Sequence, residues 1–300
     1  MQWFNRIIVK VLPFFPKSLI WIFSKRYIAG TTLDNAIKQS RELNESGCVV
    51  TMDVLGEEIA SLEEAKEAQS ICLTTVKSIH ENKVKGGLSV KLTQLGLRLD
   101  KEQCYQNVKP IVEQAKALGL FVRIDMEDAT CTSDTLDMYR RLRQDYDNVG
   151  TVVQAYLKRT PSDVQSLIDD GIANLRICKG IYEESPDIAI KDRQGIRDQY
   201  CELVQMVLEA KGFAGIATHD IPLIDWSLDY IQKNQVSKAN YEFQMLLGVA
   251  EKTRADLVKQ GHDMRIYVPY GEQWFGYCTR RLKENPKMAG HIIKNLFIRN

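Results

Sequence analysis

The feature that most constrains the fold is an eightfold alternation, starting at Cys48, between a short apolar run and a longer amphipathic stretch. The short runs are nearly continuously apolar and rich in β-branched residues, which is typical of parallel strands covered by helices. The predicted strands are Cys48–Val54, Leu88–Leu92, Phe121–Met126, Thr151–Tyr156, Asn174–Cys178, Gly215–Thr218, Tyr241–Leu246 and Met264–Val268.

The stretches between these runs have apolar residues three and four positions apart, the spacing of one helix face. In the second stretch, Cys104, Val108, Ile111 and Ala115 share a face, and Gly119 is placed to end the helix. Thr160-Pro161 and Asp220 with Pro222 have the chemistry of helix starts. We therefore predict eight strand–helix units.

Eight such units favour an α/β fold of the closed (β/α)8 TIM-barrel type. The alternative is an open doubly wound sheet, which would normally carry a G-x-G-x-x-G turn after its first strand. That motif is absent from the sequence, as are a phosphate-binding P-loop, H-E-x-x-H and a Cys/His zinc spacing. The motifs therefore favour the barrel, and we predict no metal site.

Composition narrows the class of protein further. Forty Lys and Arg residues against 39 Asp and Glu give a net charge of +1, so no overall field favours nucleic acid, and we expect no nucleic-acid partner. The seven cysteines are scattered and form no C-x-x-C pair, which indicates a reducing compartment rather than a disulfide framework. We expect a cytoplasmic protein.

The N-terminal segment differs from the rest of the chain. Residues 1–30 carry five basic residues, no acidic residue and many aromatic side chains. The apolar runs are too short for a spanning helix, which needs about 20 mostly apolar residues. Two interpretations stay open: a helical arm packed on the domain, or an interfacial segment on the inner face of a membrane, with contact through residues 1–25. We predict a helical arm over residues 1–46 and one barrel domain over residues 47–300.

Polar residues stand at seven consecutive strand ends, where TIM barrels place their working residues. Each would be costly there unless it were paired or bound to a ligand. The set is basic and amide-rich, which suits an anionic ligand such as a nucleotide cofactor together with a carboxylate substrate. Its main members are Lys91, Gln154, Arg176, Lys179 and His219.

A further cationic group follows the eighth strand. Tyr277, Arg280 and Arg281 lie at i, i+3 and i+4, so the tyrosine shares a helix face with both arginines. Two arginines beside a tyrosine suit the binding of one carboxylate from two directions.

These segments resemble the FAD-dependent proline dehydrogenase family in its short monofunctional form. They occur in family order over nearly the whole barrel, which makes the resemblance specific. The matching segments are Ser89–Gly96, Val122–Asp128, Gln154–Arg159, Leu175–Gly180, Ala217–Asp220, Glu242–Leu246, Arg265–Pro269 and Arg280–Leu282.

The resemblance implies a distorted (β/α)8 barrel that binds FAD at the C-terminal ends of its strands, without a Rossmann domain. It implies oxidation of L-proline to Δ1-pyrroline-5-carboxylate, the first step of proline catabolism, by hydride transfer from proline C5 to flavin N5. The electrons would pass to a membrane quinone. L-proline and a quinone are thus the expected partners, and FAD is the expected cofactor.

The resemblance also assigns roles to residues. Asp125 and Arg176 are the catalytic candidates: Arg176 would stabilise reduced flavin at N5, and Asp125 would hold the active-site cations in place. The residues implied for proline are Lys91, Arg280 and Arg281 for its carboxylate, and Tyr182, Leu246, Tyr267 and Tyr277 around its ring. The residues implied for FAD are Met126, Gln154, Arg176, Lys179, Gly180, Ile181, Thr218 and His219. Lys191 or Arg193 is a looser match for a FAD phosphate.

Two departures from the family pattern are modest. Ile181 stands where many members have alanine, and the segment from Gly271 to Tyr277 is shorter than in some relatives. Members that act on hydroxyproline tend to have a small residue at the position of Tyr267, so the tyrosine favours proline.

Two other functions are compatible with the sequence. One is an aldolase or lyase barrel that uses Lys91 as a Schiff-base nucleophile with Asp125 as its acid–base partner. The other is a non-catalytic barrel that binds a partner through the N-terminal arm. The first predicts a colourless protein with a carbonyl substrate that borohydride traps, and the second predicts loss of function without residues 1–30.

Overall fold

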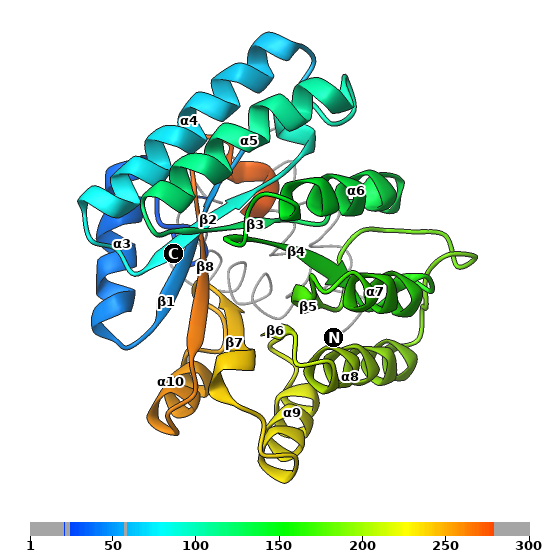
Figure 1. Cartoon of the computed structure of the whole chain (residues 1–300). Coiled ribbons are helices and arrows are strands. Elements are labelled where there is room, and N and C mark those ends of the chain that lie inside the picture. Colours follow the sequence, from blue (N-terminus) through cyan, green and yellow to red (C-terminus); the bar gives the residue numbers. More distant parts are fainter. Residues whose placement is uncertain (1–20, 22–24, 57–58, 279–300) are drawn as a thin grey trace, which may run out of the picture.

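The computed structural model describes residue 21, residues 25–56 and residues 59–278. Within this part, eight parallel strands form a closed barrel in sequence order, and β8 pairs with β1 to close it (Figure 1). The strands are β1 (Val49–Val54), β2 (Gly86–Val90), β3 (Phe121–Ile124), β4 (Val149–Gln154), β5 (Asn174–Cys178), β6 (Phe213–Ala217), β7 (Tyr241–Leu246) and β8 (Met264–Tyr270). The predicted (β/α)8 barrel is confirmed, and the open sheet is wrong.

Helices surround the barrel and connect its strands (Figure 1). The α-helices are α3 (Leu33–Glu45), α4 (Leu62–Glu81), α5 (Lys101–Ala117), α6 (Thr132–Arg143), α7 (Thr160–Asp169), α8 (Arg193–Glu209), α9 (Ile221–Lys233) and α10 (Glu251–Lys259). Short 3-10 helices are η2 (Thr93–Leu95), η3 (Ala129–Cys131) and η4 (Lys238–Asn240). Residues 274–278 are also helical.

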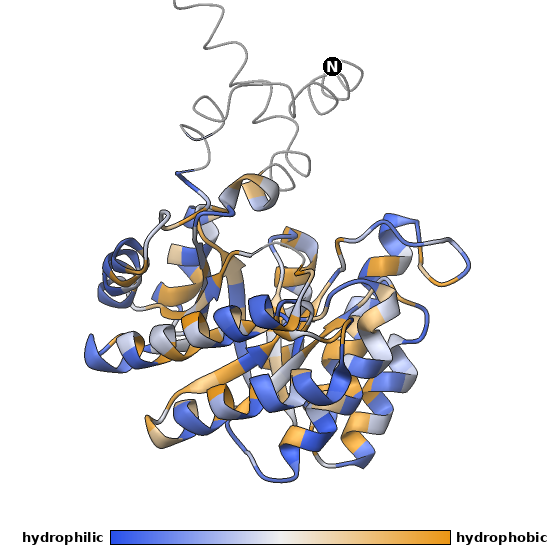
Figure 2. Ribbon diagram, turned by 90° about the horizontal axis from the view of Figure 1, so that it is seen from above, coloured by the Kyte–Doolittle hydropathy of each residue, from blue (hydrophilic) through white to orange (hydrophobic). Residues whose placement is uncertain are grey.

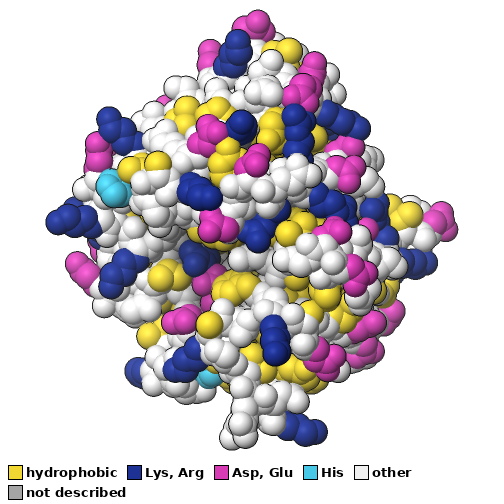
Figure 3. All heavy atoms as spheres, viewed as in Figure 1, with side chains coloured by type: hydrophobic (Ala, Val, Ile, Leu, Met, Phe, Trp, Pro, Cys, Tyr) yellow, Lys and Arg dark blue, Asp and Glu magenta, His cyan; other side chains and the backbone are white. Residues whose placement is uncertain are grey.

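The core lies in two layers, inside the barrel and between the barrel and its helices. β4 is buried along all six residues, as expected for a strand covered on both faces. The helices carry hydrophilic and hydrophobic residues in alternation, so each has one face for the barrel and one for solvent (Figure 2). Basic and acidic side chains are interspersed over the face in Figure 3, in keeping with the small net charge.

Strand bounds differ from the predicted ones mainly where a strand begins with glycine or ends before a charged residue. β2 begins at Gly86 rather than Leu88, because two glycines without side chains continue the ladder to β1 and β3. A Cβ on Gly87 would lie 2.2 Å from the carbonyl oxygen of Phe121, so the close approach of the strands requires glycine there. β3 ends at Ile124, which leaves Asp125 in the loop beyond the strand.

The helix ends follow the predicted chemistry in part. Thr160 is the first residue of α7 rather than its N-cap, which is Arg159, and its hydroxyl donates to the Gln154 carbonyl at 2.7 Å. Gly119 has φ +69° directly after the C-cap of α5, where the left-handed conformation favours glycine. Asp220 occupies the N-cap position of α9, but its side chain makes no capping hydrogen bond. The reason is that its carboxylate is bound by cations from α8 and the loop after β5, as described below.

The described part of the predicted N-terminal arm includes α3, which packs against β1 and β8. Its buried face consists of Ala36, Ile37, Ser40 and Leu43. Residues 1–20 and 22–24 lie outside the described residues, so membrane contact by the arm and the domain boundary at residue 46 stay predictions. None of the helices in the described part is long and apolar enough to cross a membrane.

Candidate active site

Asp125 is the centre of a polar network at the C-terminal ends of the strands. It directly follows β3 and is 8% exposed. One carboxylate oxygen accepts hydrogen bonds from Ser89 Oγ at 2.7 Å and from Arg176 Nη1 at 3.2 Å. The other oxygen accepts from the Tyr267 hydroxyl at 2.7 Å. Residues from β2, β5 and β8 therefore converge on one carboxylate.

Lys91 lies beside this carboxylate, one residue beyond β2. Its Nζ is 3.8 Å from Asp125 and donates a 2.5 Å hydrogen bond to Asp53 on β1. Burial alone would lower the pKa of Lys91, but the carboxylates of Asp53 and then Asp125 raise it above its usual value. The amine is thus held as an ammonium ion.

Arg176 and Tyr267 complete this group. The guanidinium carbon of Arg176 lies 5.0 Å from the centre of the Tyr267 ring, and the Nε of Arg176 is buried with no hydrogen-bond partner within the described residues. Burial, followed by the charge of Asp125, raises the pKa of Tyr267 well above 10, so its hydroxyl stays protonated and donates. We call Asp53, Lys91, Asp125, Arg176 and Tyr267 the Asp125 network. The charges of its two cations and two carboxylates cancel.

A second charged group surrounds Asp220, at the C-terminal end of β6. Its carboxylate contacts Arg197 at 2.7 and 2.9 Å, Lys179 at 3.0 Å and Arg193 at 3.4 Å. The Arg197 guanidinium in particular holds the pKa of Asp220 well below its usual value, although burial acts in the opposite direction. We call these four residues the Asp220 cluster. Three cations around one carboxylate leave two positive charges for an anion.

Gly180 lies in the loop after β5, directly after Lys179 of the Asp220 cluster. Gly180 has φ +101°, and a Cβ there would lie 2.0 Å from the ring of Tyr156, so the conformation requires glycine. The next two residues, Ile181 and Tyr182, are 44% and 37% exposed. Large apolar side chains are thus presented at the rim, where a ligand would cover them.

The other predicted residues lie at neighbouring strand ends. Gln154 donates to the carbonyl of Glu127 at 2.6 Å, and its own Oε1 is buried without a hydrogen-bond partner in the described part of the chain. His219 Nε2 accepts from the backbone N–H of Leu246 at 2.9 Å, which places the ring proton of the neutral form on Nδ1. The hydroxyl of Thr218 accepts from the backbone N–H of Asp220 at 3.1 Å.

Of four further predicted residues, the structure describes Met126 and Tyr277. Met126 is 8% exposed, next to Asp125. Tyr277 is also 8% exposed and lies near Arg176. Burial lowers the pKa of Arg176, but the charge of Asp125, with a smaller contribution from Tyr277, raises it above its usual value. Arg280 and Arg281 lie outside the described residues, so the predicted carboxylate clamp stays a prediction. Of the two looser candidates, Arg193 joins the Asp220 cluster, whereas Lys191 binds the backbone carbonyl of Glu184.

The barrel interior nearer the strand starts is charged as well. Glu242 on β7 binds Arg265 on β8 through two hydrogen bonds of 2.5 and 3.0 Å. Arg123 on β3 donates to backbone and side-chain oxygens of Asn174, and burial lowers its pKa to about 10. These arginines are fully engaged by protein groups and support the site from within the barrel.

Comparison with known proteins identifies the family of this chain. The family model described as "Proline dehydrogenase" matches residues 36–293. The chain belongs to the proline dehydrogenase family. It is 36% identical over 273 residues to proline dehydrogenase 1 of Bacillus subtilis (strain 168), which covers 91% of this chain and 90% of that protein. It is 32% identical to proline dehydrogenase of Deinococcus radiodurans, with 92% and 91% covered.

Solved structures agree with this family. Proline utilization A (PutA) from Bdellovibrio bacteriovorus, inactivated by N-propargylglycine, matches with a TM-score of 0.82 and 25% identity. The match covers 88% of this chain and 32% of that larger one. A mutant of PutA from Bradyrhizobium japonicum matches at 19% identity with a TM-score of 0.75, which supports the fold alone.

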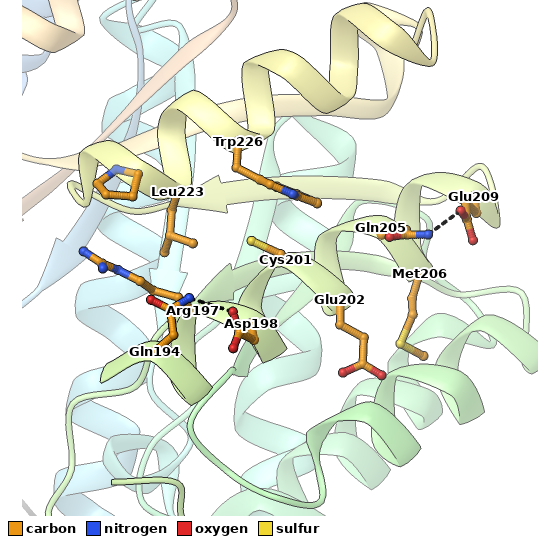
Figure 4. Close-up of a pocket in the computed structure, with 11 residues that line it drawn as sticks. Gln194, Arg197, Asp198, Cys201, Glu202, Gln205, Met206, Glu209, Leu223 and Trp226 are labelled. Carbon is orange, nitrogen blue, oxygen red and sulfur yellow. Dashed lines mark hydrogen bonds between the residues drawn. The ribbon is translucent and has the colours of Figure 1, made fainter. Parts of the chain in front are cut away.

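A groove on the outside of the barrel lies apart from this site. It runs between α8 and α9, has a volume of about 560 Å³, and combines acidic and amide side chains of α8 with Leu223 and Trp226 of α9 (Figure 4). Arg197 links the groove to the site, because it lines the groove and binds Asp220. The described residues include no group of three or more His, Cys, Asp or Glu side chains suited to a metal ion.

Three functional candidates escaped the sequence analysis. Asp53 stands inside the apolar run of β1 and carries the same signal as the polar residues at the other strand ends. Asp220 was predicted as a helix cap at the end of the sixth strand, without a role in binding, and Arg197 has the pattern of an ordinary exposed helix residue. The pairing of Asp220 with Arg197 depends on how α8 packs beside β6, and no local pattern indicates it.

Proposed function

We propose that this chain oxidises L-proline to Δ1-pyrroline-5-carboxylate with FAD as its cofactor and passes the electrons to a membrane quinone. Family membership supports proline as substrate, since the relatives similar over nine tenths of their length are named proline dehydrogenases. The observation that carries the proposal is the meeting of Lys91, Asp125, Arg176 and Tyr267 at one end of the barrel. Two fixed cations in a partly enclosed site, to which we propose that Arg280 and Arg281 add positive charge, suit an amino-acid carboxylate.

The residues present fit FAD. The Asp220 cluster provides two uncompensated positive charges, which suit a pyrophosphate. The left-handed Gly180 places no side chain at its position in the loop after β5. The Oε1 of Gln154, buried and without a hydrogen-bond partner among the described residues, offers an acceptor for a ring N–H. When bound, the flavin supplies the acceptor for the hydride from proline C5. Met126, Lys179, Ile181, Thr218 and His219 are the other proposed contacts.

Each residue of the Asp125 network then has a task. Lys91, with Arg280 and Arg281, binds the substrate carboxylate and so fixes the position of the ring. Arg176 places a fixed positive charge where negative charge develops during hydride transfer. Asp125 holds Arg176 and the Tyr267 hydroxyl in position through its hydrogen bonds.

The walls of the site exclude water and select the substrate. Tyr182, Leu246, Tyr267 and Tyr277 would surround the proline ring. The hydroxyl of Tyr267 is already committed to Asp125, so its ring cannot turn away without breaking a 2.7 Å hydrogen bond. A ring hydroxyl on the substrate would be crowded, and we propose a preference for proline over hydroxyproline.

The environment of Lys91 argues against the aldolase or lyase alternative. A Schiff-base lysine needs a lowered pKa so that its amine is free to attack. Here the carboxylates of Asp53 and Asp125 raise the pKa of Lys91 and keep it protonated. The amine therefore acts as a charge rather than as a nucleophile.

The visible spectrum of the purified protein under anaerobic conditions, before and after L-proline is added, tests the proposal. We expect a yellow protein whose flavin band bleaches with proline and, more weakly, with hydroxyproline. A yellow protein that is bleached only by another amino acid would keep the flavin cofactor but change the assigned substrate. A colourless protein that takes up no added FAD would refute the cofactor.

We also propose a cytoplasmic enzyme that reaches its quinone through residues 1–25 at the inner face of the membrane. The basic and aromatic composition of that segment supports this. Co-sedimentation with anionic liposomes should be strong for the full chain and weak for a chain without residues 1–25. Equal binding by both would refute the proposal.

A further inference from the structure

Asp53 is the buried carboxylate closest to Lys91. It is the fifth residue of β1, lies opposite Ser89 of β2 and Pro269 of β8, and is 2% exposed. One of its oxygens accepts the 2.5 Å hydrogen bond from Lys91 Nζ, and the other is buried with no hydrogen-bond partner in the described part of the chain. Lys91 is therefore its ion-pair partner among the described residues.

A carboxylate in this environment is costly unless a cation compensates for it. Burial raises the pKa of Asp53 above its usual value, and the charge of Lys91 acts in the opposite direction. The groups that face Asp53 are Lys91 after β2, Asp125 after β3, Tyr267 and Tyr270 of β8, and Cys72 of α4. Lys91 is the cation among them, so the two charges depend on each other.

Asp125 cannot hold Lys91 in the same way. Its oxygens already accept hydrogen bonds from Ser89, Arg176 and Tyr267, and its closest approach to Lys91 Nζ is 3.8 Å. The short contact that determines where the ammonium group lies is the one from Asp53. The Tyr267 hydroxyl, 3.4 Å from Nζ, borders the ammonium group on another side.

We infer that Asp53 is a positioning residue for proline binding, which acts by holding the Lys91 ammonium group charged and in the place where it meets the substrate carboxylate. This inference rests on the proposed role of Lys91 in substrate binding. It assigns Asp53 no contact with substrate or cofactor. Its effect should therefore disappear when Lys91 itself is removed.

A double-mutant cycle with the full-length holoenzyme tests this dependence. KM and kcat for proline are measured with an artificial electron acceptor for the wild type, Asp53→Asn, Lys91→Met and the double variant, at equal flavin content. We expect Asp53→Asn and Lys91→Met each to raise KM about 10- to 100-fold, as for the loss of one charged hydrogen bond. The double variant should match Lys91→Met within about threefold.

The outcomes separate this inference from the proposed function. If the two effects multiply in the double variant, or if Asp53→Asn leaves KM unchanged, Asp53 does not act through Lys91 and the inference is wrong. If Lys91→Met itself leaves KM unchanged, the proposed role of Lys91 is wrong and the inference is refuted with it. Asp170→Asn is the control, since it also removes a carboxylate from a cation, Arg140, but at the C-terminal end of α7, away from the strand ends that form the site, and it should leave KM unchanged.

A pH profile adds a readout that a merely structural role would not change. Without Asp53, the pKa of Lys91 should fall, because the largest raising charge is gone. KM for proline should then begin to rise at a lower pH in Asp53→Asn than in the wild type. If Asp53→Asn does not fold, Asp53→Glu keeps the charge but displaces it: it should raise KM and keep the wild-type pH profile, and an unchanged KM would refute the inference.

Discussion

Replacement of Lys179 by methionine tests whether the Asp220 cluster binds the cofactor. Lys179 Nζ lies 3.0 Å from Asp220, and its side chain is 37% exposed, so it is free to reach a ligand. In Lys179→Met the cluster keeps two cations against one carboxylate, and the charge excess falls from two to one. Arg197 still holds Asp220 through two hydrogen bonds, so the fold should lose at most about 1 kcal/mol.

The expected effect on FAD affinity follows from the lost contact. A hydrogen bond to a charged group contributes about 1.5–3 kcal/mol, and the exposure of Lys179 places it near the lower end. At about 1.4 kcal/mol per tenfold change, Kd for FAD should rise about 10- to 30-fold. The interaction is electrostatic, so raising the salt concentration should weaken binding more in the wild type than in the variant.

Calorimetric titration of the deflavinated protein with FAD measures this Kd. Lys238→Met is the matched control, because Lys238 is another exposed lysine that donates to a protein group, the Gly261 carbonyl in the turn before β8. The control should bind FAD like the wild type. A Kd for Lys179→Met within twofold of the wild type would show that the cluster does not bind the phosphates.

Three other variants probe the fold beneath the site. Gly180→Ala should lower the free energy of unfolding in urea by at least about 2 kcal/mol and reduce the flavin content, since φ is +101° and the new Cβ would meet an aromatic ring. Wild-type stability in the variant would contradict this. Asp220→Asn should make the free energy of unfolding fall less steeply in acid, because Arg197 lowers the pKa of Asp220 and this carboxylate therefore stabilises the fold above its unfolded-state pKa of 3.8 and loses that contribution as pH falls. An equally steep loss of stability in the variant would point to other groups. Glu242→Gln leaves Arg265 without its carboxylate and should lower the free energy of unfolding by about 3 kcal/mol, the lower end of the range for buried pairs because the Arg265 side chain is 22% exposed. A loss below about 1 kcal/mol would mean that solvent compensates for the missing carboxylate.

Much of this protein can be predicted from local sequence because the responsible physics is local. Short β-branched runs and apolar residues three and four apart specify strands and helices residue by residue, so all eight strands were predicted within about three residues of their bounds. The positions of the candidate site residues at the strand ends could also be predicted, since a buried charged residue after an apolar run is energetically costly without a partner. Lys91, Asp125, Arg176 and Lys179 carry that signal in the sequence.

The partners of these residues were decided by tertiary structure. Asp53 comes from β1, Lys91 directly follows β2, and Tyr267 comes from β8, which lies beside β1 only because the barrel closes between them. Arg197 and Asp220 meet because α8 packs beside β6. Sequence by itself determined which residues are charged and where the strands end. Register, closure and helix packing decided which charges lie within hydrogen-bonding distance, because those distances depend on segments far apart in the chain.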